Sequence, residues 1–377
     1  MLKLLSLSRH SLPAFAVAGL FGGAFHAYAP ETKLAAGASD AGFGLALLMA
    51  AAGALFAMRF AVVFEARFGN WAVAIAAIFS GFAFQAVGLA GSLPALCVAT
   101  FATGSGLGLM DVVMNSRLSA VEARSKTPLM GLNHGFFSLI YTMSALASGP
   151  LREFGVPLSL YGGGLGLLAL LCAAASIERG QKPPPGPAPG LRMRFSRLAL
   201  LGGLIIGIGF LGENGMESWS ALHLERSLGG SAIHGALGPV FFGLTMAVGR
   251  FASQALVIRL GAARLLYGAG LLASCGAGLA AMAASPSMAY LGFACAGLGI
   301  SVIAPMAYVI IGRQVSDAER SQAIAQASIL GYGGFFLGPP VTGLLAQFFG
   351  LPVAFAAVAL ALIAILPITL SLDRRSM

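Results

Sequence analysis

Two carboxylates stand one helical turn apart inside a long apolar stretch of the sequence. Glu213 and Glu217 are four residues apart, so a helix places both side chains on one face. Two carboxylates that approach each other in a medium of low dielectric cannot both ionise cheaply, and one of them can hold a proton near neutral pH. The alternative is a solvated place at the end of the stretch, which suits Glu217 better than Glu213. We therefore expect Glu213 to be the stronger candidate for reversible proton binding.

A second acidic site lies in another apolar stretch. Asp111 precedes Asn115 by four residues and Arg117 by six, so Asp111 and Asn115 share a helix face. An ionisable group within a membrane span usually faces a cavity, which makes these two residues candidates for a binding site. Equally open is an ion pair between Asp111 and Arg117, or an arginine of a loop, that locks one side of the molecule.

Several other polar and aromatic side chains could contact a solute. Trp219 and Tyr28 stand near the ends of two apolar stretches, where each ring lines a cavity or belongs to an outer aromatic belt. His26 could exchange protons or bind a hydroxyl group, and a structural role is its alternative. Gln254 and Gln326 are candidates for recognising hydroxyl groups, with hydrogen bonds between helices as the alternative.

Four arginines are candidates for gating. Arg59 and Arg250 stand where two loops are expected to begin, and Arg67 and Arg259 follow in the same loops. Guanidinium groups at a helix end can bridge acidic groups and helix C-termini of neighbouring helices, which would hold one side of the molecule shut. Extension of these side chains toward lipid headgroups is the alternative.

The elements that carry these residues are membrane spans. Hydrophobic residues make up 58% of the 377 and charged residues only 9%, whereas a soluble chain carries about a quarter charged residues. Apolar stretches of about 20 residues, each long enough to cross a bilayer as a helix, follow one another along the chain. The twelve expected spans are 11–29, 41–64, 71–91, 93–116, 130–150, 156–177, 198–221, 234–257, 263–284, 287–311, 322–348 and 352–371.

The placement of the charges sets the expected topology. Of the 22 basic residues, all but Lys33, Arg152 and Arg226 fall on one side if the N-terminus is inside. The positive-inside rule then places both termini in the cytoplasm, and it explains the net charge of +9 without a nucleic-acid partner. A cleavable signal peptide ending near residues 27–29 is the alternative for the first span.

Cofactor chemistry has no support in the sequence. The four cysteines lie in apolar spans at no metal-ligand spacing. Neither a Ser/His/Asp arrangement, an HExxH motif nor a Walker A loop is found, so we expect neither an enzyme nor a primary pump, and no cofactor or metal.

The twelve spans divide into two halves. The Pro-rich segment 178–197 is expected to be a cytoplasmic linker between six-helix bundles at 1–177 and 198–377. An offset of 191 residues places residues 106–108 (GLG) on 297–299 (GLG), and 59–61 (RFA) on 250–252 (RFA). Tyr28 falls on Trp219 at the same offset. Several matches at one offset indicate an internal duplication, and parallel repeats of six spans are the plan of the major facilitator fold.

The chain resembles the major facilitator superfamily over essentially its whole length. The loop with Arg59, Glu65, Arg67 and Gly69 is similar to a degenerate form of that superfamily's Gly/Asp/Arg loop motif. Three strings are similar to the bacterial YbjJ-like branch, which is related to the fucose:proton symporters. They are GLGLMDVVMNSRLSAVE at 106–122, ENGMESWSALHL at 213–224 and GYGGFFLGPPVTGLLA at 331–346.

This resemblance implies a bacterial inner-membrane protein with twelve helices in two pseudo-symmetric halves. It implies a monomeric, proton-coupled secondary transporter for a sugar or another small polar solute, with alternating access about a site between the halves. The fucose-permease group also carries an acid and an amide in its fourth span, which implies that Asp111 contacts the solute or carries the proton. Drug or metabolite efflux and a receptor or scaffold without transport remain alternatives, because one fold serves many functions.

Overall fold

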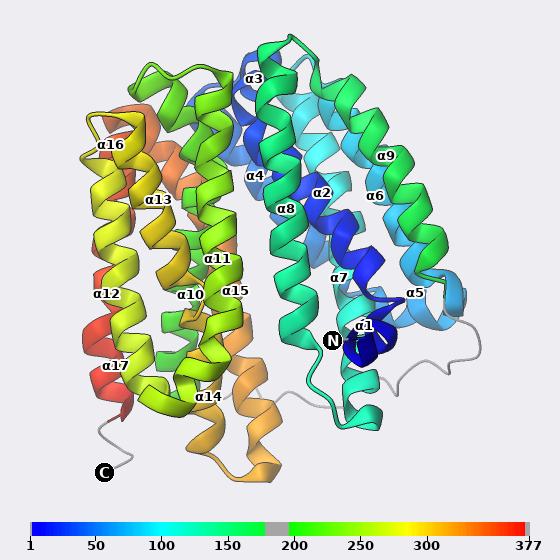
Figure 1. The fold of residues 1–377 in the computed structure, drawn as a ribbon, viewed down its shortest axis with the longest axis vertical. Helices are drawn as coiled ribbons and strands as arrows, with labels where there is room; N and C mark the ends of the chain where they lie inside the picture. Colours follow the sequence, from blue (N-terminus) through cyan, green and yellow to red (C-terminus); the bar gives the residue numbers. More distant parts are fainter. Residues whose placement is uncertain (1, 178–195, 374–377) are drawn as a thin grey trace. The chain divides into compact units, whose positions relative to one another are not determined.

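The computed structural model describes residues 2–177 and 196–373, and every regular element among them is helical (Figure 1). Most of the predicted linker 178–197 lies outside the described residues. The helices up to residue 177 are α1 (Leu2–Ser8), α2 (Leu12–Ala27), α3 (Ala29–Ala35), α4 (Asp40–Met58), α5 (Ala61–Phe68), η1 (Gly69–Trp71), α6 (Ala72–Gly88), α7 (Leu93–Ser125), α8 (Met130–Glu153) and α9 (Leu158–Ala175).

The second stretch of described residues continues in the same way. Its helices are α10 (Arg197–Leu222), η2 (His223–Ser227), α11 (Ala232–Leu260), α12 (Ala262–Ala281), α13 (Pro286–Ile300), α14 (Ile303–Arg313), α15 (Asp317–Phe349), α16 (Leu351–Ile363) and α17 (Ile365–Asp373). Several begin at a serine that accepts a hydrogen bond from the backbone N–H three residues on. Ser92, Ser196 and Ser285 do so at the starts of α7, α10 and α13, as N-cap residues do.

The lengths and hydropathy of these helices confirm a polytopic all-α membrane fold. Ten helices or continuous helix runs are long and apolar enough to cross a membrane, and α2 with α3 makes an eleventh if this pair, bent by 66°, is one span. Helix α8 is 24 residues long but more polar, with Asn133 and His134 in its first turn. Together with α8, these segments lie at the twelve positions expected from the sequence.

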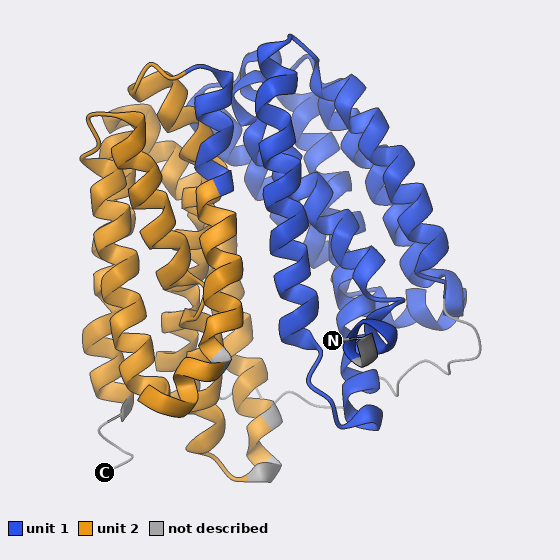
Figure 2. Ribbon diagram, in the orientation of Figure 1, with its two compact units in different colours: residues 1–187, 231–240 blue, residues 188–230, 241–377 orange. Residues whose placement is uncertain are grey.

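The chain forms two compact units, and each is described by itself (Figure 2). Unit 1 comprises Met1–Pro187 and Ser231–Val240, and unit 2 comprises Ala188–Gly230 and Phe241–Met377. Helix α11 therefore begins in unit 1 and continues into unit 2. Within unit 1, α2 packs mainly on α8 and α4 on α7, and within unit 2 α10 packs mainly on α15 and α12 on α13.

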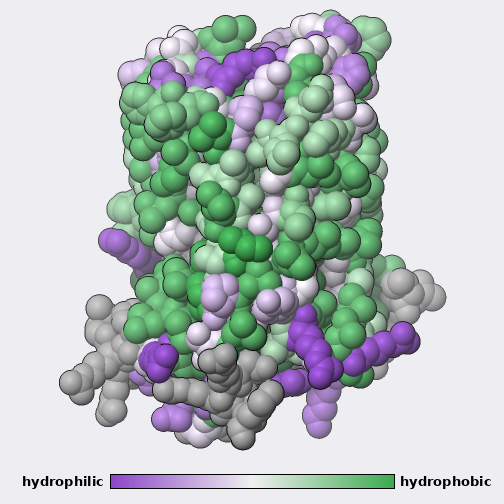
Figure 3. Space-filling model, turned by 90° about the vertical axis from the view of Figure 1, so that its left-hand side faces the viewer, coloured by the Kyte–Doolittle hydropathy of each residue, from purple (hydrophilic) through white to green (hydrophobic). Residues whose placement is uncertain are grey.

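Hydrophobic side chains cover the middle of the face drawn in Figure 3, and hydrophilic ones gather toward its two ends. Large apolar side chains such as Phe82, Ile258 and Leu360 are 73%, 85% and 72% exposed. Apolar exposure on this scale fits a lipid environment, in which helices satisfy their own backbone groups.

Glycines allow the closest helix contacts inside each unit. A Cβ added at Gly104 in α7 would lie 1.8 Å from the carbonyl oxygen of Ala50 in α4. A Cβ at Gly334 in α15 would lie 1.8 Å from the carbonyl oxygen of Gly207 in α10. Backbone contact at these two crossings is possible only for glycine, as is common between membrane helices.

Candidate functional site

The centre of the candidate site is an ion pair between α10 and α11 in unit 2. Nη2 of Arg250 donates to Oε1 of Glu213 at 3.2 Å. Both side chains are largely buried, with 19% of Arg250 and 18% of Glu213 exposed. Glu213 lies sixteen residues after Arg197, where α10 begins, which is about 24 Å along the helix. Glu213 therefore lies well inside the candidate span Arg197–Ser227, and Arg250 lies near the end of the candidate span Ala232–Ser253.

The sequence-based placement of Arg250 at the start of a loop is wrong. Arg250 lies within α11, which continues to Leu260, whereas Arg59 caps α4 and is followed by a turn before α5 begins. The two RFA strings thus occupy different local structures. The physical reason is the partner: the carboxylate of Glu213 compensates the guanidinium charge of Arg250, which lets the helix carry that charge into the span.

Glu217 and Trp219 extend the site along α10. Glu217 lies one turn beyond Glu213 and is half-buried. The ring of Trp219 is 0% exposed, so neither alternative proposed for it, a cavity wall or an outer belt, describes its position. Trp219 is a core side chain, because the end of α10 packs against α16 and α13 rather than presenting this face to lipid.

Tyr28, the sequence counterpart of Trp219, is also buried rather than exposed. Its hydroxyl donates to the carbonyl oxygen of Val156 at 2.9 Å, and its ring stacks on Tyr161 with centroids 5.8 Å apart. Arg152 covers the same ring, with Cζ 5.7 Å from its centroid, and the Arg152 Nε donates to Glu31 at 2.5 Å. The outer-belt and cavity-wall predictions for Tyr28 are therefore both wrong, because these contacts close over the ring.

Asp111 and Asn115 are brought together as expected. The Asn115 Nδ2 donates to Oδ1 of Asp111 at 2.8 Å and to its carbonyl oxygen at 2.9 Å. The proposed ion pair between Asp111 and Arg117 does not form. Arg117 instead donates from Nε to Oε1 of Glu65 at 2.8 Å and from Nη2 to the carbonyl oxygen of Gly69 at 2.6 Å. The reason is helical geometry, since six residues place Asp111 and Arg117 on different faces.

His26 and Gln326 have contacts with neighbouring helices. The His26 Nδ1 lies 2.9 Å from the hydroxyl of Tyr141, which joins α2 to α8. The Gln326 Oε1 accepts from the backbone N–H of Ser196 at 3.5 Å, at the start of α10. The side chain of Gln254 lies outside the described part of the chain.

Three of the four gating candidates are at the surface. Arg59 follows the last residue of α4, Arg67 lies in α5 with Cζ 5.9 Å from the ring centroid of Phe68, and Arg259 lies in the last turn of α11. All three side chains are exposed. Their roles in gating remain predictions.

Two contacts, one in each unit, are not predicted by the sequence. One is the buried pair of Glu65 and Arg117, and the other joins Asn214, next to Glu213, to the carbonyl oxygen of Phe335 in α15 at 3.2 Å. The motif-like loop gave a signal for the first pair, because it contains Glu65. No local signal existed for the second, whose partners are 121 residues apart.

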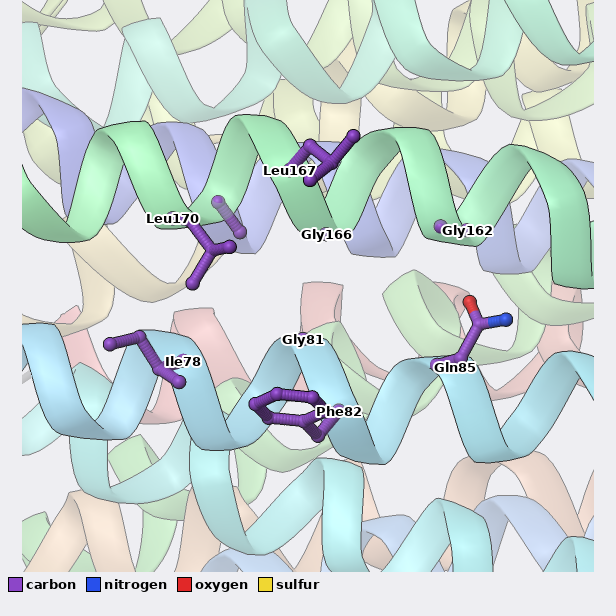
Figure 4. A pocket seen from close by; sticks show the side chains of 10 residues that line it. Ile78, Gly81, Phe82, Gln85, Gly162, Gly166, Leu167 and Leu170 are labelled. Atoms are coloured by element: carbon purple, nitrogen blue, oxygen red, sulfur yellow. The ribbon is translucent and has the colours of Figure 1, made fainter.

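A groove of about 170 Å³ lies elsewhere in unit 1, between α6 and α9 (Figure 4). Its walls are apolar apart from Gln85, and the lining residues Phe82 and Leu167 are 73% and 67% exposed. This groove holds no ionisable side chain and does not belong to the candidate site. Among the described residues, no group of three or more His, Cys, Asp or Glu could hold a metal ion.

Comparison with known proteins identifies the family. An uncharacterized MFS-type transporter of Yersinia pestis is 30% identical over 93% of this chain and 92% of its own length. The chain belongs to the major facilitator superfamily. The sequence model described as Major Facilitator Superfamily matches residues 219–376. An uncharacterized transporter of Sinorhizobium fredii is also 30% identical, over 97% of this chain and 98% of its own.

Two solved structures of other proteins share the fold. A nucleoside transporter, NupG, aligns with a TM-score of 0.77 and 11% identity over 98% of this chain and 99% of its own. A bacterial homolog of the human lysosomal transporter Spinster, in an inward-facing and occupied conformation, aligns with a TM-score of 0.73 and 17% identity over 99% and 96%. Membership of the superfamily, shown by the relative of Yersinia pestis, makes this chain a multi-pass membrane transporter for a small molecule, and not an enzyme.

Proposed function

We propose that this chain is a secondary active transporter that couples the movement of a small polar solute to protons by alternating access. The observation that carries the proposal is the ion pair of Glu213 and Arg250 inside α10 and α11. A charged pair in a membrane span is costly and usually functional. Glu217, one turn from Glu213, adds a second carboxylate, and low dielectric favours a single negative charge between the two.

The pair links a proton to a solute by exchange of partners. A proton that binds Glu213 removes the charge that Arg250 neutralises. The guanidinium donors of Arg250 then become available to an acceptor on the solute, such as a hydroxyl or carboxylate oxygen. Deprotonation of Glu213 restores the ion pair and displaces the solute. In both steps the guanidinium donors of Arg250 have an acceptor, because a buried donor left unsatisfied is costly.

The solute class follows from the donors and acceptors at hand. In unit 2, Arg250 donates and Glu213 accepts. In unit 1, Asn115 donates and Asp111 accepts. A sugar or another small polar metabolite with several hydroxyl groups requires both kinds of partner. We also propose membership of the YbjJ-like branch, which the strings at 106–122, 213–224 and 331–346 support. The proposal includes two six-helix halves joined by residues 178–197, a monomer, and both termini on the cytoplasmic side of a bacterial inner membrane.

Accumulation in proteoliposomes tests the proposal. A ligand-induced thermal-shift screen of sugars, polar metabolites and drugs on the purified protein first selects a solute. An inwardly directed proton gradient is then expected to drive its accumulation, and Glu213→Gln is expected to abolish accumulation while leaving solute exchange intact. Glu319→Gln, which changes an exposed carboxylate, is the matched control.

The outcomes separate the alternatives. Solute movement that is the same with and without the proton gradient would refute proton coupling. Expulsion of drugs in exchange for protons would identify an efflux permease, and binding without flux would identify a receptor. Undiminished accumulation by Glu213→Gln would refute the role of Glu213.

A further inference from the structure

Helix α15 contains a break in its hydrogen bonding that faces α10. Pro339 and Pro340 lie inside the helix, which runs from Asp317 to Phe349. Proline has no backbone N–H, so the carbonyl group four residues earlier loses its helical partner, and the ring pushes that carbonyl aside. For Pro339 that carbonyl belongs to Phe335.

The carbonyl of Phe335 receives its hydrogen bond from α10 instead. Nδ2 of Asn214 donates to it at 3.2 Å, and Asn214 is only 7% exposed. An amide side chain thus supplies the donor that Pro339 lacks. The adjacent residue, Glu213, forms the ion pair with Arg250 of α11. Two successive residues of α10 therefore make the two contacts. Asn214 donates to the carbonyl group at the proline break of α15, and Glu213 pairs with Arg250 of α11.

The two helices are in firm contact around this point. Cβ atoms added at Gly334 and Gly338 of α15 would lie 1.8 Å from the carbonyl oxygen of Gly207 and 3.0 Å from that of Leu211. The ring of Phe210 packs edge-on against Phe335, with centroids 6.2 Å apart. At such close contact, a change in the bend of α15 also moves α10.

We propose that Asn214 is a positioning residue that couples the bend of α15 at Pro339 to the setting of Glu213 toward Arg250. The inference rests on the proposed function of the Glu213 and Arg250 pair. A bend in α15 moves the carbonyl of Phe335, and Asn214 transmits that movement to the adjacent residue of α10. Asn214 itself binds neither proton nor solute.

A double-mutant cycle in thermal unfolding tests the contact without any assay of transport. Asn214→Ala leaves the carbonyl of Phe335 without a donor and is expected to lower the unfolding temperature. Pro339→Ala restores a backbone N–H at position 339, which can donate to that carbonyl. The cost of Asn214→Ala is therefore expected to fall by at least half in the Pro339→Ala background. Equal costs in both backgrounds would overturn the contact.

A matched control separates this contact from general packing. Thr342 in α15 donates from Oγ1 to the carbonyl oxygen of Gly338 at 2.8 Å within its own helix. The cost of Thr342→Ala is expected to be unchanged by Pro339→Ala. If the cost of Thr342→Ala fell as much as that of Asn214→Ala, Pro339→Ala would only make the helix pair more tolerant of any substitution. That result would overturn the inference.

The pH profile of transport tests the positioning role. Asn214→Ala is expected to shift the pH of half-maximal gradient-driven accumulation and to lower the accumulation ratio about tenfold, with solute exchange within about twofold of the native rate. Asn214→Gln, which keeps the amide donor, is expected to recover part of the ratio. An unchanged pH profile in Asn214→Ala would reduce Asn214 to a structural residue. If the native protein shows no proton coupling, the proposed function fails instead, and the unfolding cycle still decides the contact.

Discussion

Glu213 and Arg250 are joined by a hydrogen-bonded ion pair of 3.2 Å although 37 residues separate them in the chain. Each charge makes the other tolerable in a span where water is scarce. The guanidinium of Arg250 therefore compensates the carboxylate of Glu213 and is not an independent surface charge of α11. Removal of either partner changes the state of the other.

Loss of Arg250 is expected to destabilise the fold. Arg250→Ala leaves a largely buried carboxylate unpaired, and we expect a loss of about 2 to 3 kcal/mol, the low end of the range for broken buried pairs. The double variant Arg250→Ala with Glu213→Gln is expected to recover part of the loss. Thermal unfolding in detergent measures both. Arg259→Ala, at an exposed site in the same helix, is expected to cost less than about 0.5 kcal/mol, and an equal cost at the two sites would contradict the pairing.

Arg117 is expected to be irreplaceable by lysine. Its Nε and Nη2 bind Glu65 and the carbonyl oxygen of Gly69 at the same time, and one ammonium group cannot match that fork. We expect Arg117→Ala to cost about 3 kcal/mol and Arg117→Lys to recover less than half of it. Chemical unfolding of the purified protein gives the comparison, with Arg67→Ala as a control at an exposed arginine. Full recovery by lysine would mean that charge alone matters here.

Two adjacent glycines in α15 are expected to respond in opposite ways to alanine. The added Cβ of Gly334→Ala would meet the carbonyl oxygen of Gly207 at 1.8 Å, so α10 and α15 must separate, at a cost of about 2 kcal/mol or more. Nothing lies within 4 Å of the Cβ of Gly333→Ala, and this variant is expected to be neutral or slightly stabilising. Unfolding temperatures of the pair measure the difference, and similar values would argue against backbone contact at this crossing.

Asp111 is expected to affect solute affinity rather than proton coupling. Asp111→Asn keeps an acceptor for the Nδ2 of Asn115, so we expect a change in stability below about 0.5 kcal/mol. If Asp111 contacts the solute, its loss raises KM while the accumulation ratio still follows the proton gradient. Transport kinetics at two imposed gradients distinguish these quantities. Abolished accumulation with an unchanged KM would instead make Asp111 the proton carrier.

The positions of the helices could be predicted because they depend on local composition. A run of apolar residues long enough for a bilayer needs no knowledge of the rest of the chain. The surroundings of single charges could not be predicted in this way. The sequence predicts that Arg250 begins a loop, because the partner that compensates its charge inside the helix, Glu213, lies on another helix. The repeated RFA string reinforced the error, since only the copy at Arg59 ends a helix.

Burial of the aromatic residues also depended on contacts distant in sequence. The sequence predicts Tyr28 and Trp219 near the ends of spans, where exposed aromatic belts are common. The covering groups of Tyr28 are Tyr161 and Arg152, more than 120 residues later. The sequence likewise showed Pro339 but not that Asn214 supplies the missing hydrogen bond. Sequence patterns therefore predict the helices and most of the candidate residues, but not which side chains face one another.

Unit 1 is assembled from two separate stretches of the chain, because Ser231–Val240 belongs to it. Ala236 and Val240 from this stretch form a small apolar cluster with Ala27 and Ala145. The whole of α10 must therefore be synthesised before Ala236 and Val240 can complete this cluster. A fragment that ends at residue 187 would leave Ala27 and Ala145 uncovered, and a membrane peptide containing residues 231–240 should bind to it.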